Sequence, residues 1–423
     1  MDYTKLENEH YNLHLIQTNR FKTINVIIDF KRKLKKDEIT IRNVLCNNIL
    51  EGTHTIPSRR MLEIKTEELY DLAYRCGNCF NGKYSILSFG ITYINPKYTE
   101  SKMHDESFKF LSDLIFDVNV SNNKFCKNNF DIAKKTVKDN IDTISENVSL
   151  YSQIRMLEEM EDSIISYRNC GYLEDLNKIT EKNLYDYYLD IINNDSVNIF
   201  IIGDIDINTS NELVNKYFKF SNNKKNNDSH FYIPKKISGE VNIVSEKFDK
   251  EQSTLVVGFK IDKMTDFERR YVSTIYNYIL GGSTESNLFK TVREENSLCY
   301  YITSSIQPLL NIGLIRAGIN AKDFNKVEDL IYKELKKISE GVFDDNKINN
   351  AITTYISSLS DLEDNPRSII SLYAGIEYLK SDDIKTRKEK IVKVTKNDII
   401  NFSKKIHLST IYLLEGNDDN EEE

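Results

Sequence analysis

The chain has 423 residues, a length that predicts two or three domains. Hydrophobic residues make up 40% of it and charged residues 29%, and this balance excludes a disordered or collagen-like protein. Its net charge of −8 argues against nucleic acid as the main partner, because phosphate binding needs a basic surface. No apolar run approaches the ~20 residues of a membrane-spanning helix. The first residues also lack the basic and then apolar pattern of a secretory signal. We therefore expect a cytoplasmic protein with neither nucleic acid nor a membrane as partner.

The first half begins with a β-branched strand at residues 24–30 and a helix at residues 39–50 that stops at Gly52. Between them, residues 31–36 include five basic side chains. No glycine-rich cradle accompanies this run, so we interpret it as a solvated loop and not as a phosphate site. The pattern then predicts a strand at 84–94, helices at 105–117 and 128–144, and a closing strand at 197–202.

Cys76 and Cys79 form a C-x-x-C pair in this half. A zinc site would need a second pair or histidines at ligand spacing, and neither follows. Gly77 and Gly82 indicate a turn here, whereas a thioredoxin-like pair would open a helix. We interpret the two thiols as structural or incidental.

A polar run at residues 221–229 predicts a linker, which we place at 221–235. The second half then repeats the first, with helix ends that match in detail: Ile279-Leu280-Gly281-Gly282-Ser283 corresponds to Ile49-Leu50-Glu51-Gly52-Thr53. We therefore predict a duplicated α+β protein with domains at 1–220 and 236–423, each an antiparallel-rich sheet covered by helices on one face. The second half is predicted to contain strands at 254–260, 299–306, 313–319 and 410–414, and helices at 266–280, 322–338 and 345–359.

Catalytic motifs are scarce. The chain has six histidines and contains neither H-E-x-x-H nor H-x-x-E-H, and no phosphate-binding glycine loop or G-x-S-x-G elbow occurs. His10 and His14 lie in an alternating, strand-like pattern, where their separation is too large for both to bind one metal directly.

The most distinctive segment is residues 288–301, LFKTVREENSLCYY, which follows the Gly281-Gly282-Ser283 helix stop. It resembles the second-half signature of the M16 zinc peptidases, the family of pitrilysin and the mitochondrial processing peptidase. Arg293 and Tyr300 fall on the arginine and tyrosine with which that family holds substrate opposite the zinc. The resemblance covers essentially the whole chain and implies the small, paired-subunit branch of the family.

One departure from the family pattern decides the interpretation. Aligning on Gly52-Thr53 places the family's H-x-x-E-H on residues 43–47, where Asn43 and Asn47 replace the histidine ligands and Cys46 replaces the glutamate base. The third ligand falls near Ala133. Amides are poor zinc ligands and a thiol cannot act as the carboxylate base, so the resemblance implies no cofactor on this chain and zinc on a partner.

Two functions remain open. The first is a non-catalytic subunit that pairs with an H-x-x-E-H-bearing homologue to cut short or unfolded peptides, with Arg293 and Tyr300 binding substrate in trans. Within that class the chain is most similar to proteins associated with 5-aminopentanol modification of elongation factor P, and bacteriocin maturation subunits are close competitors. The second is a catalytically inert binding or scaffold protein. An independent peptidase with a relocated metal site is disfavoured because histidine is so scarce.

Overall fold

The computed structural model describes residues 1–220, 228–237, 239–249 and 252–417, so residues 221–227 of the predicted linker lie outside the described residues. The described chain forms two compact units, and each unit borrows one segment from the other half of the sequence. The first unit comprises Met1–Thr143, Arg168–His230 and Glu363–Leu379. The second comprises Ile144–Tyr167, Phe231–Leu362 and Lys380–Glu423. This grouping differs from a simple division at the linker.

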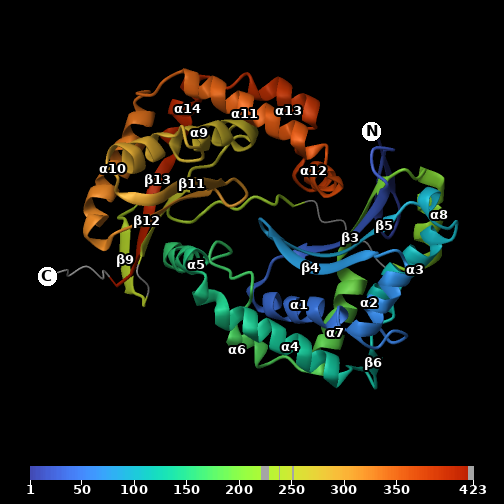
Figure 1. Ribbon diagram of the computed structural model, residues 1–423. Coiled ribbons are helices and arrows are strands. Elements are labelled where there is room, and N and C mark those ends of the chain that lie inside the picture. Colours follow the sequence, from blue (N-terminus) through green and yellow to red (C-terminus); the bar gives the residue numbers. More distant parts are fainter. Residues whose placement is uncertain (221–227, 238, 250–251, 418–423) are drawn as a thin grey trace. The chain divides into compact units, whose positions relative to one another are not determined.

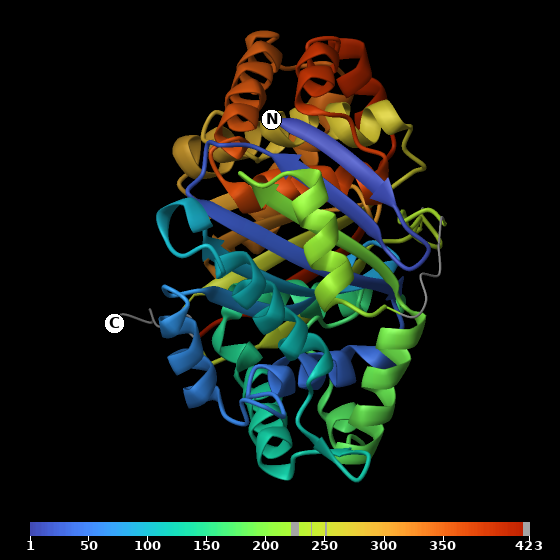
Figure 2. The ribbon, with the colours of Figure 1, turned by 90° about the vertical axis from the view of Figure 1, so that its right-hand side faces the viewer.

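The first unit is built on a six-stranded sheet of order β1-β2-β8-β3-β5-β4. Its longest strands, β3 and β5, pair antiparallel, and β2 and β8 form the one parallel pair. The N-terminal strand β1 lies at one edge of the sheet and β4 at the other (Figure 2). The strands are β1 Asp2–Glu7, β2 Asn12–Gln17, β3 Thr23–Lys33, β4 Ala73–Asn81, β5 Tyr84–Ile94 and β8 Ser196–Gly203, with a separate hairpin of β6 Val120–Ser121 and β7 Lys124–Phe125.

Helices cover one face of this sheet and share a single apolar core with it (Figure 1). Every second residue of β3, from Ile24 to Phe30, points into that core, as expected for the period-two alternation of a strand. The helices are α1 Lys36–Ile49, α2 Arg59–Glu68, α3 Met103–Phe116, α4 Lys127–Asp142, α6 Leu173–Leu176, α7 Glu181–Asn194 and α8 Ile207–Tyr217.

The opposite face of the sheet carries α12 (Pro366–Leu379), a helix from the second half of the sequence (Figure 1). Ile369 and Ile370 pack against strand residues such as Phe200 in a second, smaller core. The Tyr378 hydroxyl donates a hydrogen bond of 2.8 Å to the buried carboxylate of Asp29. The sheet is therefore covered by helices on one face, as predicted, and by this additional helix on the other.

The second unit repeats the plan with a five-stranded sheet of order β11-β12-β10-β13-β9. Its strands are β9 Asn242–Lys247, β10 Ser253–Ile261, β11 Cys299–Gln307, β12 Ile312–Ile319 and β13 Ile406–Glu415. One face is covered by α9 Ser273–Leu280, α10 Phe324–Ser339, α11 Asn346–Leu362, α13 Ile384–Ile391 and α14 Lys396–Ser403. No helix in the described part of the chain is long and apolar enough to cross a membrane.

The borrowed helix of the second unit is α5 (Val148–Met160), which packs on the other face of that sheet. It approaches the strands closely: a Cβ added at Gly258 on β10 would lie 2.4 Å from the Met160 methyl carbon and 2.5 Å from the Met156 sulfur. Glycine at this position therefore makes room for the two methionines. The predicted α+β fold with an internal repeat is thus confirmed. The sequence did not predict that each unit includes a helix from the other half of the chain, α12 in the first unit and α5 in the second.

Two local predictions were wrong. The basic run at residues 31–36 is not a solvated loop, because β3 continues to Lys33 and buries Lys31, whose ammonium lies 4.8 Å from the Tyr84 ring and 5.0 Å from the Tyr378 ring. The C-x-x-C pair does not lie in a turn, because both cysteines belong to β4 and the turn comes only at Gly82. In both places pairing with a neighbouring strand outweighs the local residue preference.

Buried histidines in the first unit predict a dependence of stability on pH. His14 is fully buried, and burial lowers its pKa to about 4, against an ordinary value of 6.5. His230 behaves in the same way, with its pKa lowered to about 4 by burial and then by Lys31. Below pH 6.5 the unfolded chain therefore binds more protons than the folded chain, so the free energy of unfolding should fall between pH 6.5 and 4. Urea unfolding of wild type and His14→Asn should show this slope flattened in the variant, and an equal slope would contradict the assignment.

Candidate functional site

Arg293 and Tyr300 come from two consecutive elements of the second unit. Arg293 lies near the end of a short helical segment, η4 (Phe289–Glu295), and Tyr300 is the second residue of the edge strand β11. Between them Ser297 has φ 52°, the left-handed region that favours glycine. This sharp turn joins helix to strand and brings the two side chains to one place.

Both side chains line one cavity of about 310 Å³. Tyr300 is 82% exposed, and the Arg293 guanidinium lies over the Phe289 ring at 4.8 Å and forms no ion pair with a described residue. Burial raises the pKa of the neighbouring Cys299 thiol to about 11, and the positive charge of Arg293 acts against that rise. The lining residues are Gln252, Arg293, Ser297, Leu298, Cys299, Tyr300, Gly318, Ile319 and Asn320.

A β-bulge directs Tyr300 outward. Along β11 the register with β12 shifts between Cys299, which faces Ile319, and Tyr301, which faces Gly318, so Tyr300 has no partner opposite. Bulges of this kind re-aim a side chain at the rim of a sheet. Tyr301, by contrast, lies against the sheet, since a Cβ at Gly318 would be 2.7 Å from its ring. Neighbouring tyrosines therefore have different surroundings, and Tyr301 is the matched control for Tyr300.

The positions of the missing zinc motif lie on α1 in the first unit. Asn43 and Asn47 are one turn apart, and their amides are engaged by backbone: Asn43 Nδ2 donates to the Asn169 carbonyl at 2.7 Å, and Asn47 Nδ2 donates to the Asn43 carbonyl at 2.8 Å. These are structural hydrogen bonds of a helix surface.

Cys46 and Ala133 occupy the remaining positions of the motif. Both are buried in the apolar core of the first unit, where α1 packs on α4. Cys46 and Ala133 thus add apolar packing where a catalytic member would place a base and a ligand. Among the described residues, no group of three or more His, Cys, Asp or Glu side chains has the arrangement of a metal site.

We expect the purified chain to bind no stoichiometric zinc, because amides and a thiol replace two imidazoles and a carboxylate at residues 43–47. Elemental analysis after dialysis against a weak chelator measures this directly. One tightly held zinc per chain would contradict the prediction.

Restoring the motif on α1 should not restore activity. In the triple variant Asn43→His, Cys46→Glu and Asn47→His, the methyl group of Ala133 still supplies no third ligand, and three protein ligands are the minimum for catalytic zinc. The triple variant alone should therefore show no zinc-dependent proteolysis. Adding Ala133→Glu provides the comparison, and chelator-sensitive activity of the triple variant would be the contrary result.

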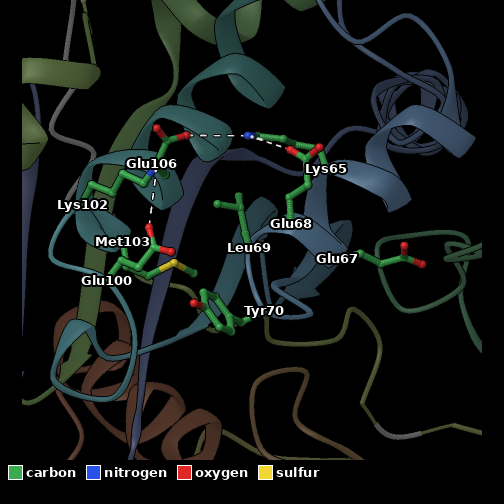
Figure 3. Close-up of a pocket in the computed structure, with 9 residues that line it drawn as sticks. All are labelled: Lys65, Glu67, Glu68, Leu69, Tyr70, Glu100, Lys102, Met103 and Glu106. Carbon is green, nitrogen blue, oxygen red and sulfur yellow. Dashed lines mark hydrogen bonds and ion pairs between the residues drawn. The ribbon is translucent and has the colours of Figure 1, made fainter.

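A second cavity, of about 280 Å³, lies in the first unit between the end of α2 and the start of α3. In Figure 3 Lys65 lies between two carboxylates, and its ammonium is 3.2 Å from Glu68 and 3.7 Å from Glu106. Lys102 similarly approaches Glu100 at 3.8 Å. The lysines are neutralised by glutamates of the cavity itself, so we assign no ligand to it. The lining residues are Lys65, Glu67, Glu68, Leu69, Tyr70, Glu100, Lys102, Met103 and Glu106.

Comparison with known proteins agrees with the fold and with the altered motif. Residues 178–355 match the family described as Peptidase M16 inactive domain. The chain is also 26% identical, over 97% of its length and 98% of the relative, to a Bacillus subtilis protein named probable inactive metalloprotease YmfF. The chain is therefore similar in sequence to proteins of the M16 peptidase family. The name of that relative describes it as probably inactive, and residues 43–47 of this chain do not contain H-x-x-E-H.

Solved structures show the same fold over the full chain. A conserved protein from Enterococcus faecalis V583 superimposes with a TM-score of 0.92 at 24% identity and covers 100% of both chains. An M16 inactive-domain protein from Pseudomonas fluorescens has a TM-score of 0.79 at 12% identity, covering 98% of each chain. The chain therefore has the fold of these M16-like proteins, and residues 43–47 do not contain H-x-x-E-H.

The sequence pattern missed part of the cavity that Arg293 and Tyr300 line. Gln252, which directly precedes β10, and Gly318 on β12 also line it, and strand pairing brings them next to β11. Ser297 also lines the cavity, in a left-handed conformation that its residue type does not predict.

Proposed function

We propose that this M16 chain is the non-catalytic subunit of a heterodimeric metallopeptidase and supplies Arg293 and Tyr300 to the zinc site of an H-x-x-E-H-bearing partner. The observation that carries the proposal is the cavity of the second unit, where an arginine without an ion partner among the described residues and an outward-directed tyrosine lie side by side. The zinc positions of the same chain hold Asn43, Cys46 and Asn47.

The two side chains suit the substrate side of a peptidase. A guanidinium presents several N–H donors and can hold two carbonyl oxygens of an extended peptide. A tyrosine hydroxyl can donate to the oxyanion that forms when the peptide carbonyl is attacked. The zinc of the partner would supply the activated water. This chain would therefore bind and orient the peptide and stabilise the charge that develops in the transition state.

The second candidate is an inert binding or scaffold protein of the M16 fold. It is favoured by the replacement of every expected zinc position, which leaves the cavity of Arg293 and Tyr300 as a docking site without chemistry. In that case Tyr300→Phe and Arg293→Ala would change only the affinity for a peptide. The first candidate requires them to change the turnover of a complex.

The cellular setting is part of the proposal. A cytoplasmic location follows from the sequence pattern and a link to modification of elongation factor P from the sequence resemblance, and both stay predictions.

Native affinity purification of the full chain tests the pairing. The chain should retain a homologue that contains H-x-x-E-H, with about one zinc per pair and none after the partner is removed. A chain recovered only with itself, or zinc that stays with this chain after separation, would contradict the proposal. The doubly substituted Arg293→Ala, Tyr300→Phe chain should still retain the partner if these residues act on substrate alone.

A further inference from the structure

Two arginine side chains of the first unit face the same small cavity on the α12 side of the sheet. Arg75 extends from the edge strand β4, and Arg367 lies in the first turn of α12. The cavity has a volume of about 10 Å³, close to the space that one water molecule occupies. Its lining residues are Asn25, Ile27, Ala73, Tyr74, Arg75, Gly90, Ile91, Thr92 and Arg367.

The sheet is shaped to bring Arg75 to this place. Arg75 pairs with Gly90 on β5, and a Cβ added at Gly90 would lie 2.8 Å from Arg75 Nε and 3.3 Å from its Cγ. Only the missing side chain of Gly90 lets Arg75 lie across the neighbouring strand, so any larger residue would displace the guanidinium.

Neither guanidinium is neutralised within the described part of the chain, where Arg75 and Arg367 form no ion pair and their side chains form no hydrogen bond. Burial lowers the pKa of Arg75, and the positive charge of Arg367 lowers it further. Asp29 is the acid that acts on Arg75. Its oxygens, however, already accept hydrogen bonds from Ser88 at 2.5 Å and Tyr378 at 2.8 Å, and burial raises its pKa.

The other polar groups around the cavity are already bonded to each other. Thr92 Oγ1 donates to Asn25 Oδ1 at 2.6 Å. The backbone N–H groups of Arg367 and Ser368, which begin α12, donate to Asn365 Oδ1 at 2.9 and 3.4 Å, so the helix start is capped and is not itself the site. Among the described residues that line the cavity, the side-chain donors without an acceptor are those of the two guanidiniums.

We propose that Arg75 and Arg367 form a binding site for a carboxylate group carried by a peptide. Two like charges held near each other in a partly buried place call for an anion, and a guanidinium fork matches the two oxygens of a carboxylate. The cavity has room for about one oxygen atom, so one carboxylate oxygen would enter it. The other oxygen and the rest of the ligand would lie outside the cavity, on the side where Arg367 is exposed. This site uses neither Arg293 nor zinc and stands independently of the proposed peptidase role.

Binding of a minimal peptide tests the site. Acetyl-alanyl-alanine with a free carboxylate, the same peptide as its C-terminal amide, and sodium acetate are titrated by calorimetry into the full-length chain. The acid should bind and the amide should not. Arg75→Gln and Arg367→Gln should each weaken binding of the acid about tenfold or more, whereas Arg20→Gln, whose guanidinium already pairs with Asp364 at 2.9 Å, should not. If acetate binds as tightly as the peptide acid, or if the amide binds equally well, the proposal of a peptide carboxylate is overturned.

The melting temperature provides a second test, which distinguishes an anion-binding role of Arg367 from a stabilising role in the fold. Arg367 is exposed and its side chain makes no hydrogen bond to a described residue, so Arg367→Gln should fold normally. In a buffer without chloride or carboxylates, this variant should melt at a higher temperature than wild type, because one of two repelling charges is gone. Added peptide acid should then raise the melting temperature of wild type alone. If the variant melts at a lower temperature than wild type in the absence of anions, the guanidiniums of Arg75 and Arg367 do not repel each other enough to destabilise the chain.

Discussion

Replacing Tyr300 by phenylalanine should lower the turnover of the assembled peptidase about 10²- to 10³-fold, which is the usual cost of losing one donor to an oxyanion. Only the hydroxyl is removed from a side chain that is 82% exposed, so the packing of β11 and the stability of the chain should hardly change. Steady-state kinetics of the complex with an unfolded peptide measure the effect, which should appear in kcat more than in KM.

Tyr301→Phe and Arg293→Ala complete this comparison. Tyr301 lies against Gly318 and not in the cavity, so its hydroxyl should be dispensable for turnover. Arg293→Ala should mainly raise KM, because the guanidinium would hold the peptide in the ground state as well as in the transition state. Equal losses from Tyr300→Phe and Tyr301→Phe, with unchanged kinetics for Arg293→Ala, would show that the substrate assignment is wrong.

Asp195→Asn should destabilise the chain by about 3–5 kcal/mol, the range found when one member of a buried ion pair is removed. Asp195 is 1% exposed and accepts from Arg32 Nε at 2.5 Å, with Arg42 Nη1 at 3.5 Å. Arg42 is itself 1% exposed, so the substitution leaves a guanidinium buried without its carboxylate. Equilibrium urea unfolding of the full chain, followed through the transition of the first unit, measures the loss of unfolding free energy.

Asp190→Asn is the matched control for this prediction. Asp190 pairs with the same Arg32 at 2.7 Å, but its side chain is 46% exposed. Exposed ion pairs contribute about 0–1 kcal/mol, so this variant should unfold nearly as wild type does. Similar losses from both substitutions would show that burial does not decide the strength of these pairs.

The regular elements could be predicted wherever a strong period continued along the chain. The strand at 24–30 is the centre of β3, and the helix predicted at 39–50 is α1 (Lys36–Ile49). The sequence pattern did not predict the polar end of β3, where Lys31 is buried between the rings of Tyr84 on β5 and Tyr378 on α12. Those rings are far away in the sequence, so no local pattern could reveal them.

The sequence also could not predict that α5 packs in the second unit and α12 in the first. Each helix has an apolar face that would suit any sheet, and the sequence does not say which sheet it covers. In the candidate site, too, local sequence predicts some features and the tertiary structure determines the others. A motif identifies Arg293 and Tyr300, because the spacing along one turn and one strand is local. The cavity around them, and the meeting of Arg75 with Arg367, depend on strand pairing and on a helix from the other half of the chain.

Peptide hydrolysis measured with the chain alone, with a zinc-bearing M16 homologue alone, and with an equimolar mixture tests the proposed role most directly. The proposal predicts that activity appears only in the mixture, is removed by a zinc chelator, and is reduced by Tyr300→Phe on this chain. A homologue that cleaves as fast alone as in the mixture, or a chain that cleaves by itself, would contradict it.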